Sequence, residues 1–117
     1  MEQVKLAYKV WLDRDGKAFG EGPYRLLKLV EKTGSLHQAA IEMKMSYRKA
    51  WLTIRFIEEK LGFPLLVRHA GGHSGGGSTI TPQCAEFIRH YEDFRADVEK
   101  TLEDVYKKYS PLFMSVV

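Results

Sequence analysis

The stretch SLHQAAIEMKMSYRKAWLTIRFIEEKLG, Ser35 to Gly62, decides the fold. Ser35 followed by Gln38 has the capping-box spacing, which predicts a helix from residue 35 to about residue 43. Ser46 can cap a second helix, and Gly62 is placed to end it. The second helix carries its apolar residues at steps of four, three and four: Ala50, Ile54, Ile57 and Leu61. Because only two or three residues separate the two helices, they form one helix-turn-helix unit.

The residues before this unit predict two short strands and one more helix. VKLAYKVWLD, residues 4–13, alternates apolar and polar side chains, which favours a strand. DRDG after it is typical of a turn, and KAFG can return as a second strand. A helical pattern then begins at Pro23 and ends at Gly34, a residue type that suits a helix C-terminus.

The residues after the unit predict a β-hairpin with a glycine-rich tip. PLLVR and STIT are two short strand candidates, and RHAGGHSGGGSTITP, residues 68–82, holds five glycines between them. A phosphate-binding loop needs a lysine before its Ser or Thr, and Gly77 is followed directly by Ser78 and Thr79. A dinucleotide fingerprint needs a βαβ unit, which this order of elements lacks. We therefore interpret the glycines as a hairpin tip rather than as a nucleotide cradle.

Thr81 and Pro82 are typical of the opening of a helix, which we expect to run over about residues 82–109 and to end before Pro111. Its apolar residues recur at helical spacing: Phe87, Tyr91, Phe94, Val98, Leu102, Val105 and Tyr109. A stripe this long exceeds what so small a domain can cover, so these residues predict the interface of a homodimer. Alternatively, part of the stripe packs on the strand and helix of residues 4–33 of the same chain.

Two helices joined by a short turn and followed by a hairpin are the order of a winged helix-turn-helix. We expect a mainly α fold with small β-hairpins and a long C-terminal dimerisation helix. The single domain would span residues 1–117, with the helix-turn-helix at about 35–61 and the wing at about 63–81. In this fold the second helix enters the major groove of DNA and the hairpin reaches the backbone or the minor groove.

Two quoted segments carry a family resemblance. TGSLHQAAIEMKMSYRKAW and LGFPLLVRHAGGHSGGGSTITP resemble the N-terminal DNA-binding domain of ModE-type molybdate-responsive regulators, which is similar to the winged helix-turn-helix of LysR-type regulators. The resemblance covers roughly residues 4–109 and implies double-stranded DNA binding and dimerisation. The family's wing usually carries a lysine, where this chain has His73 and Ser74. Because the family continues into oxyanion-binding domains and this sequence ends at Val117, molybdate binding is not expected.

The candidate DNA-contacting residues lie at the start of both helices and in the wing. They are Ser35, Gln38, Ser46, Tyr47, Arg48, Lys49, Arg55, Arg68, His69, Gly72 and His73. The side chain of Arg48 can form hydrogen bonds with guanine O6 and N7. The alternative for the leading turn is a solvated helix end. Trp51 can equally well pack in the core, and Arg55 can pair with Glu58 or Glu59 instead of reaching a phosphate.

Charge and composition weigh against other classes of protein. Residues 1–81 hold 13 Lys and Arg against 8 Asp and Glu, and the rest hold 5 against 7, so the basic excess lies with the helix-turn-helix and wing. No catalytic grouping is identifiable and no cofactor is implied. Cys84 is the sole cysteine, and His69 and His73 lie on a glycine loop, so no metal site is expected. Without a signal peptide or a membrane span, we expect a cytoplasmic protein. The alternative function is a winged-helix protein-interaction module that does not bind DNA, or one that acts with a separate effector subunit.

Overall fold

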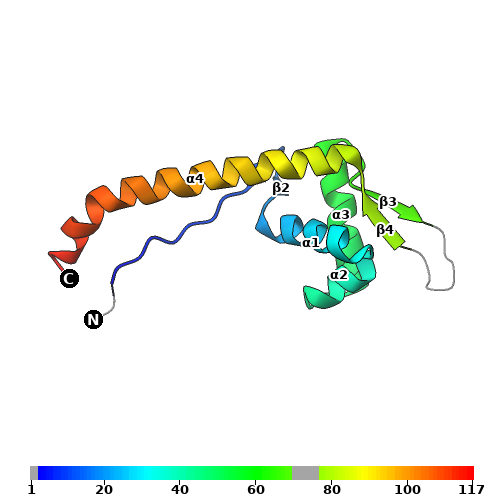
Figure 1. Cartoon of the computed structure of the whole chain (residues 1–117), viewed down its shortest axis with the longest axis horizontal. Coiled ribbons are helices and arrows are strands. Elements are labelled where there is room, and N and C mark those ends of the chain that lie inside the picture. The colour runs from blue at the N-terminus through cyan, green and yellow to red at the C-terminus, as the bar shows by residue number, and fades with distance from the viewer. Residues whose placement is uncertain (1–2, 70–76) are drawn as a thin grey trace. The chain divides into compact units, whose positions relative to one another are not determined.

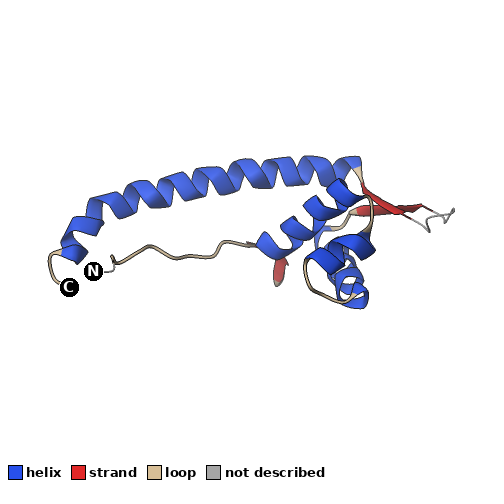
Figure 2. Cartoon of the chain, turned by 60° about the horizontal axis from the view of Figure 1, so that its bottom comes forward, coloured by secondary structure: helices blue, strands red, loops and turns tan. Residues whose placement is uncertain are grey.

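The structure is a computed structural model that describes residues 3–69 and 77–117. Its elements, in chain order, are β1 (Leu12–Asp13), β2 (Lys17–Phe19), α1 (Glu21–Thr33), α2 (Leu36–Glu42), α3 (Tyr47–Leu61), β3 (Leu66–His69), β4 (Gly77–Ile80) and α4 (Pro82–Met114) (Figure 1). The chain divides into two compact units, one spanning Trp11–Ile88 and the other formed by the residues up to Val10 with Arg89–Val117. Helices dominate both units (Figure 2), which confirms the mainly α fold with two small hairpins and a long C-terminal helix.

The caps predicted around the helix-turn-helix are present. The Ser35 side chain accepts a hydrogen bond from the Gln38 N–H, and the Ser46 side chain accepts one from the Lys49 N–H, both at 3.0 Å. Gly62 ends α3 in the left-handed conformation, at φ 85°. The capping box of α2 forms only by half, because the N–H of Ser35 donates to Thr33 Oγ1 rather than to the Gln38 side chain. These caps set where α3 begins and ends.

The core of the first unit lies between the helices of the helix-turn-helix, α1, and the start of α4. Its largest fully buried side chains are Phe19, Leu26, Leu27, Val30, Leu65 and Cys84. Burial, followed by the nearby carboxylates of Glu31 and Glu58, raises the pKa of the Cys84 thiol to about 12. The thiol therefore stays protonated at neutral pH, which suits a core side chain and not a nucleophile or metal ligand.

The base of the wing is fixed to the α1–α2 junction. β3 and β4 pair in antiparallel register from Leu66 opposite Ile80 to His69 opposite Gly77. The Ser78 N–H donates to the Gly34 carbonyl at 2.9 Å, and a Cβ on Gly77 would lie 2.9 Å from that same oxygen. Position 77 therefore requires glycine for close backbone approach rather than for flexibility.

The strand predicted over residues 4–13 is wrong for most of its length. Only Leu12 and Asp13 pair, with β2, and residues 3–11 form no strand within the described chain. The alternation is real, since Val4, Leu6 and Tyr8 are apolar and spaced by two, but all three side chains are exposed. A strand also needs a neighbour for its backbone hydrogen bonds, and β2 is only three residues long. The hydroxyl of Tyr106 on α4 instead donates to the Val4 carbonyl.

The predicted end of the last helix before Pro111 is also wrong, because α4 continues to Met114 with Pro111 inside it. The proline lacks the N–H that would complete one helical hydrogen bond, but its carbonyl accepts from the Ser115 N–H at 3.0 Å. Figure 1 shows the last turns, coloured orange to red, bending away from the axis of the turns before them. A proline inside a helix is a usual cause of such a bend.

Candidate nucleic-acid interface

The leading turn of α3 is presented to solvent. Ser46, Tyr47, Arg48 and Lys49 are all exposed. The opposite face of α3 is buried through Ala50, Ile54 and Ile57, which hold the helix on the core. Within the described residues, the side chains of Arg48 and Lys49 form no ion pair. Two unneutralised cations therefore project from the first turn of α3.

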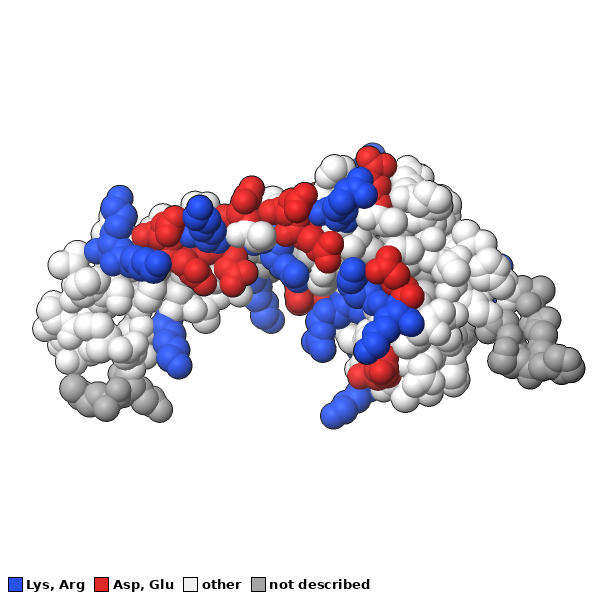
Figure 3. Space-filling model, viewed as in Figure 1, with Lys and Arg blue, Asp and Glu red and all other residues white. Residues whose placement is uncertain are grey.

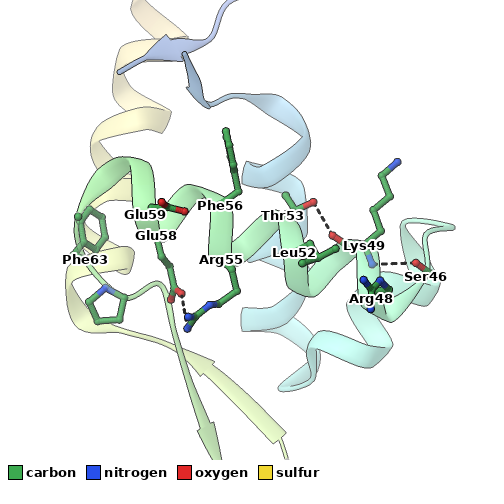
Figure 4. A pocket seen from close by; sticks show the side chains of 12 residues that line it. Ser46, Arg48, Lys49, Leu52, Thr53, Arg55, Phe56, Glu58, Glu59 and Phe63 are labelled. Atoms are coloured by element: carbon green, nitrogen blue, oxygen red, sulfur yellow. Dashed lines mark hydrogen bonds and ion pairs between the residues drawn. The ribbon is translucent and has the colours of Figure 1, made fainter. Parts of the chain in front are cut away.

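An open groove runs along the outer face of α3 (Figure 4). It is lined by Ser46, Arg48, Lys49, Leu52, Thr53, Arg55, Phe56, Glu58, Glu59, Gly62, Phe63 and Pro64. The Thr53 hydroxyl donates to the Lys49 carbonyl at 2.8 Å, so its one hydrogen is used within the helix. The groove is cationic toward the start of α3 and acidic toward its end.

The sequence left two interpretations of Arg55 open, an ion pair with Glu58 or Glu59 and a contact with a phosphate, and the structure is compatible with both. Its guanidinium is 3.9 Å from Glu58, and the Arg55 side chain remains 65% exposed. The Glu58 carboxylate is already engaged, because its second oxygen accepts from the Leu65 N–H at 2.7 Å. The Arg55 guanidinium also lies over the ring of Trp51, 5.5 Å from its centre. Trp51 is 36% exposed, so it is not a core residue of the kind considered from sequence.

A smaller polar pocket lies where the starts of α2 and α3 meet the base of the wing. It has a volume of about 260 Å³ and is lined by Ser35, Leu36, His37, Tyr47, Arg68, His69, Gly77 and Ser78. Arg68 donates to the Tyr47 hydroxyl, which joins the wing to α3. His69 Nε2 lies 3.0 Å from Thr79 Oγ1, across the two wing strands. The structure thus brings together four of the residues singled out in the sequence, Ser35, Tyr47, Arg68 and His69.

Other candidates fall outside these two pockets. Gln38 is exposed on α2 but lines neither of them. Gly72 and His73 lie outside the described residues, so their place in the wing stays a prediction.

Sequence reasoning missed several lining residues or gave them only a secondary role. His37, which the sequence placed with Ser35 and Gln38 at the start of the supporting helix as a secondary candidate for backbone contact, reaches the polar pocket, and its ring lies 5.8 Å from that of Tyr47. Leu52 and Phe56 line the α3 groove. The sequence held the signal for Leu52, because a buried stripe at residues 50, 54 and 57 places residue 52 on the opposite side of the helix. No local pattern predicts the pocket around His37, since that pocket depends on contacts between distant segments.

The apolar stripe of α4 changes character along the helix. Phe87 packs within its own chain, with ring centres 5.0 Å from Phe19 and 5.8 Å from Phe63, and Tyr91 is buried. Val98 and Leu102 are half-buried. The exposed apolar residues of the helix are Phe94, Val105, Tyr109, Leu112 and Phe113. The stripe beyond Tyr91 is therefore the part left with apolar surface to cover.

Acidic side chains outnumber basic ones on α4. Figure 3 shows Asp and Glu side chains gathered along α4, which carries seven acidic and five basic residues.

The described residues contain no group of three His, Cys, Asp or Glu side chains that could hold a metal ion. Among the same residues, no helix has the length and apolar character needed to cross a bilayer.

A protein family and several individual known proteins resemble this chain. Residues 24–84 match the family described as bacterial regulatory helix-turn-helix protein, lysR family. The chain is 33% identical over 103 residues to the molybdenum-pterin-binding protein MopB of Rhodobacter capsulatus, which covers 88% of this chain and 38% of that protein. It is 31% identical over 104 residues to the molybdenum transport protein ModE of Azotobacter vinelandii, and this match also covers 88% of this chain and 38% of that protein.

A third relative is the DNA-binding transcriptional dual regulator ModE of Escherichia coli K12, which is 32% identical over 80 residues, 68% of this chain and 30% of that protein. The resemblance to ModE-type regulators predicted from the sequence is confirmed. The chain spans between 30% and 38% of the length of these three relatives.

Proposed function

Because this chain belongs to the lysR family of bacterial regulatory helix-turn-helix proteins, we propose that it binds double-stranded DNA sequence-specifically, as a homodimer that regulates transcription. The observation that carries the proposal is the exposed leading turn of α3, with Arg48 and Lys49 free of ion pairs within the described residues. In helix-turn-helix proteins these first residues of the second helix meet base edges in the major groove. We assign the protein to the cytoplasm, where its DNA would be, and we assign it no catalytic role.

Arg48 is the proposed base reader. It projects from the first turn of α3, and its planar guanidinium can donate two parallel hydrogen bonds to guanine O6 and N7. Lys49 is a flexible point charge beside it, which suits a phosphate contact. Ser46 and the start of α3 add N–H groups and the positive end of the helix dipole toward the backbone.

The polar pocket is the proposed seat of a backbone phosphate. Arg68 supplies a full positive charge, while Ser35, His37 and His69 supply polar atoms around it. Because Arg68 is hydrogen-bonded to Tyr47, a phosphate held there would fix the orientation of α3 relative to the wing. Arg55, whose guanidinium lies over the ring of Trp51, is the proposed second backbone contact. Gln38, Gly72 and His73 remain proposed contacts.

The homodimer is proposed from the exposed stripe of α4. Phe94, Val105 and Tyr109 are each more than 40% exposed, and apolar surface of this extent on one helix favours coverage by a second copy. Val98 and Leu102 complete the stripe, with Phe87 and Tyr91 at its buried end. Two copies related by a two-fold axis would present their α3 helices to half-sites about one helical turn apart, so the DNA site should be a pseudo-palindrome.

Binding measured by fluorescence anisotropy at several salt concentrations tests the proposal. The logarithm of the affinity should fall linearly with the logarithm of the salt concentration, by roughly one unit of slope for each neutralised phosphate. Arg68→Ala should reduce the slope by about one unit per subunit and weaken binding to all sequences alike. Lys107→Ala removes the same charge from α4 and should leave the slope unchanged. A binding signal that is absent, or insensitive to salt, would favour a module that binds protein instead of DNA.

A further inference from the structure

We propose that Leu52 selects thymine in each half-site by contacting its C5-methyl group in the major groove. The inference rests on the proposed function, since it requires α3 to lie in that groove. It assigns a base-specificity role to a residue outside the charged and polar groups that line most of the groove. It also predicts where the selected thymine lies relative to the guanine read by Arg48.

The position of Leu52 on α3 carries the first step. Leu52 lies four residues after Arg48, one turn further along the same face, and its side chain is 46% exposed. It lines the same groove as Arg48 and Arg55, and Figure 4 draws it on the surface of the helix between them. A single exposed leucine is ordinary on a protein surface. This one lies between two arginines on the face that the proposed function places against DNA.

The chemistry of the base edges carries the second step. In the major groove, thymine alone presents a methyl group, whereas cytosine presents an amino donor at the equivalent edge. A leucine side chain can bury the methyl but cannot hydrogen-bond the amino group, so cytosine there would lose a bond to water without a replacement. Thr53, the next residue, donates its one hydroxyl hydrogen to the Lys49 carbonyl, so it has no hydrogen left to donate to a base edge. Leu52 should therefore favour thymine over cytosine.

The spacing of the two readers locates the thymine. One turn of an α-helix advances about 5.4 Å, and successive bases along a strand are about 3.4 Å apart. Residues four apart on a helix lying along the groove therefore address positions roughly one or two base pairs apart. The selected thymine should lie at that distance from the guanine contacted by Arg48, in both half-sites.

Uracil substitution tests the inference, because deoxyuridine differs from thymidine only by the missing methyl group. A duplex would first be selected from random DNA with the full chain, and each thymine of a half-site would then be replaced by deoxyuridine in turn. We expect one replacement per half-site to weaken wild-type binding roughly fourfold, as the loss of one buried methyl group implies. Leu52→Ala should bind the thymine and deoxyuridine duplexes equally at that position and keep its sensitivity elsewhere. Leu52→Gln, which can hydrogen-bond adenine, should lose the preference for thymine and gain one for adenine.

A matched control separates this contact from a general loss of apolar surface. Ile41 on α2 is 55% exposed and lines neither pocket, so Ile41→Ala should keep the wild-type response to deoxyuridine. If every deoxyuridine duplex binds like its thymine parent, or if Leu52→Ala responds as wild type does, the role of Leu52 is overturned while DNA binding stands. If selection recovers no bound duplex at all, the proposed function itself fails, and this inference with it.

Discussion

Replacing Val105 with aspartate is expected to separate the proposed homodimer into monomers. Val105 is 49% exposed within the uncovered part of the α4 stripe, and the dimer would enclose it. A carboxylate enclosed there without a partner costs several kcal/mol, more than one helix-to-helix contact can offset. Analytical ultracentrifugation should report the mass of a single chain for Val105→Asp and of two chains for the wild type.

The loss of the dimer should appear in DNA binding as a loss of avidity. Two linked DNA-binding domains bind a duplex with two half-sites about 10² to 10⁴ times more tightly than one domain binds a single half-site. Val105→Asp should therefore weaken binding to the full site by at least about 100-fold and leave binding to an isolated half-site unchanged.

Ala96 offers a control on the same helix. It is exposed on the side of α4 opposite the stripe, so Ala96→Asp adds the same carboxylate away from the proposed interface. Ala96→Asp should remain a dimer with wild-type affinity. A Val105→Asp protein that sediments as a dimer and binds the full site normally would show that the stripe is not the interface.

Arg48→Ala is expected to remove most of the sequence preference at one position of each half-site. A bidentate arginine–guanine contact is worth about 1–3 kcal/mol of discrimination against other bases. Competition anisotropy against duplexes changed at each position should therefore show one position per half-site at which Arg48→Ala no longer distinguishes guanine. Binding to unrelated DNA should change little, because backbone contacts supply most of it.

Lys49→Ala is the matched comparison for that experiment. It removes a neighbouring cation from the same turn, but one proposed to contact phosphate, so it should weaken all duplexes by a similar factor and reduce the salt slope. If Arg48→Ala instead weakens every sequence equally, as Lys49→Ala is expected to, then Arg48 does not read a base.

Sequence patterns predicted the parts of the fold that local chemistry determines. Ser35, Ser46 and Gly62 were placed correctly at helix ends, because capping depends on residues within one turn of one another. The strand predicted over residues 4–13 is wrong because strand pairing depends on a partner strand elsewhere in the chain, whose presence alternation alone does not reveal. Pro111 predicts the end of the last helix, but α4 continues through it to Met114.

The same division applies to the candidate site. The leading turn of α3 was predictable, since one cap and one buried stripe fix both its start and its exposed face. The polar pocket was not, because it joins Ser35, His37 and Tyr47 to Arg68 in the wing through contacts between segments far apart in the chain. The outer face of α3 was predictable in principle, since the buried stripe at residues 50, 54 and 57 places Leu52 on the opposite side of the helix.

Methylation interference on a selected duplex tests most directly the claim that the first turn of α3 reads the major groove. Methylation of guanine N7 blocks the major-groove edge, whereas methylation of adenine N3 blocks the minor-groove edge. We predict that N7 methylation of one guanine in each half-site abolishes wild-type binding, and that Arg48→Ala loses this interference at the same guanine. Interference confined to adenine N3, or an N7 pattern identical in wild type and Arg48→Ala, would contradict the account.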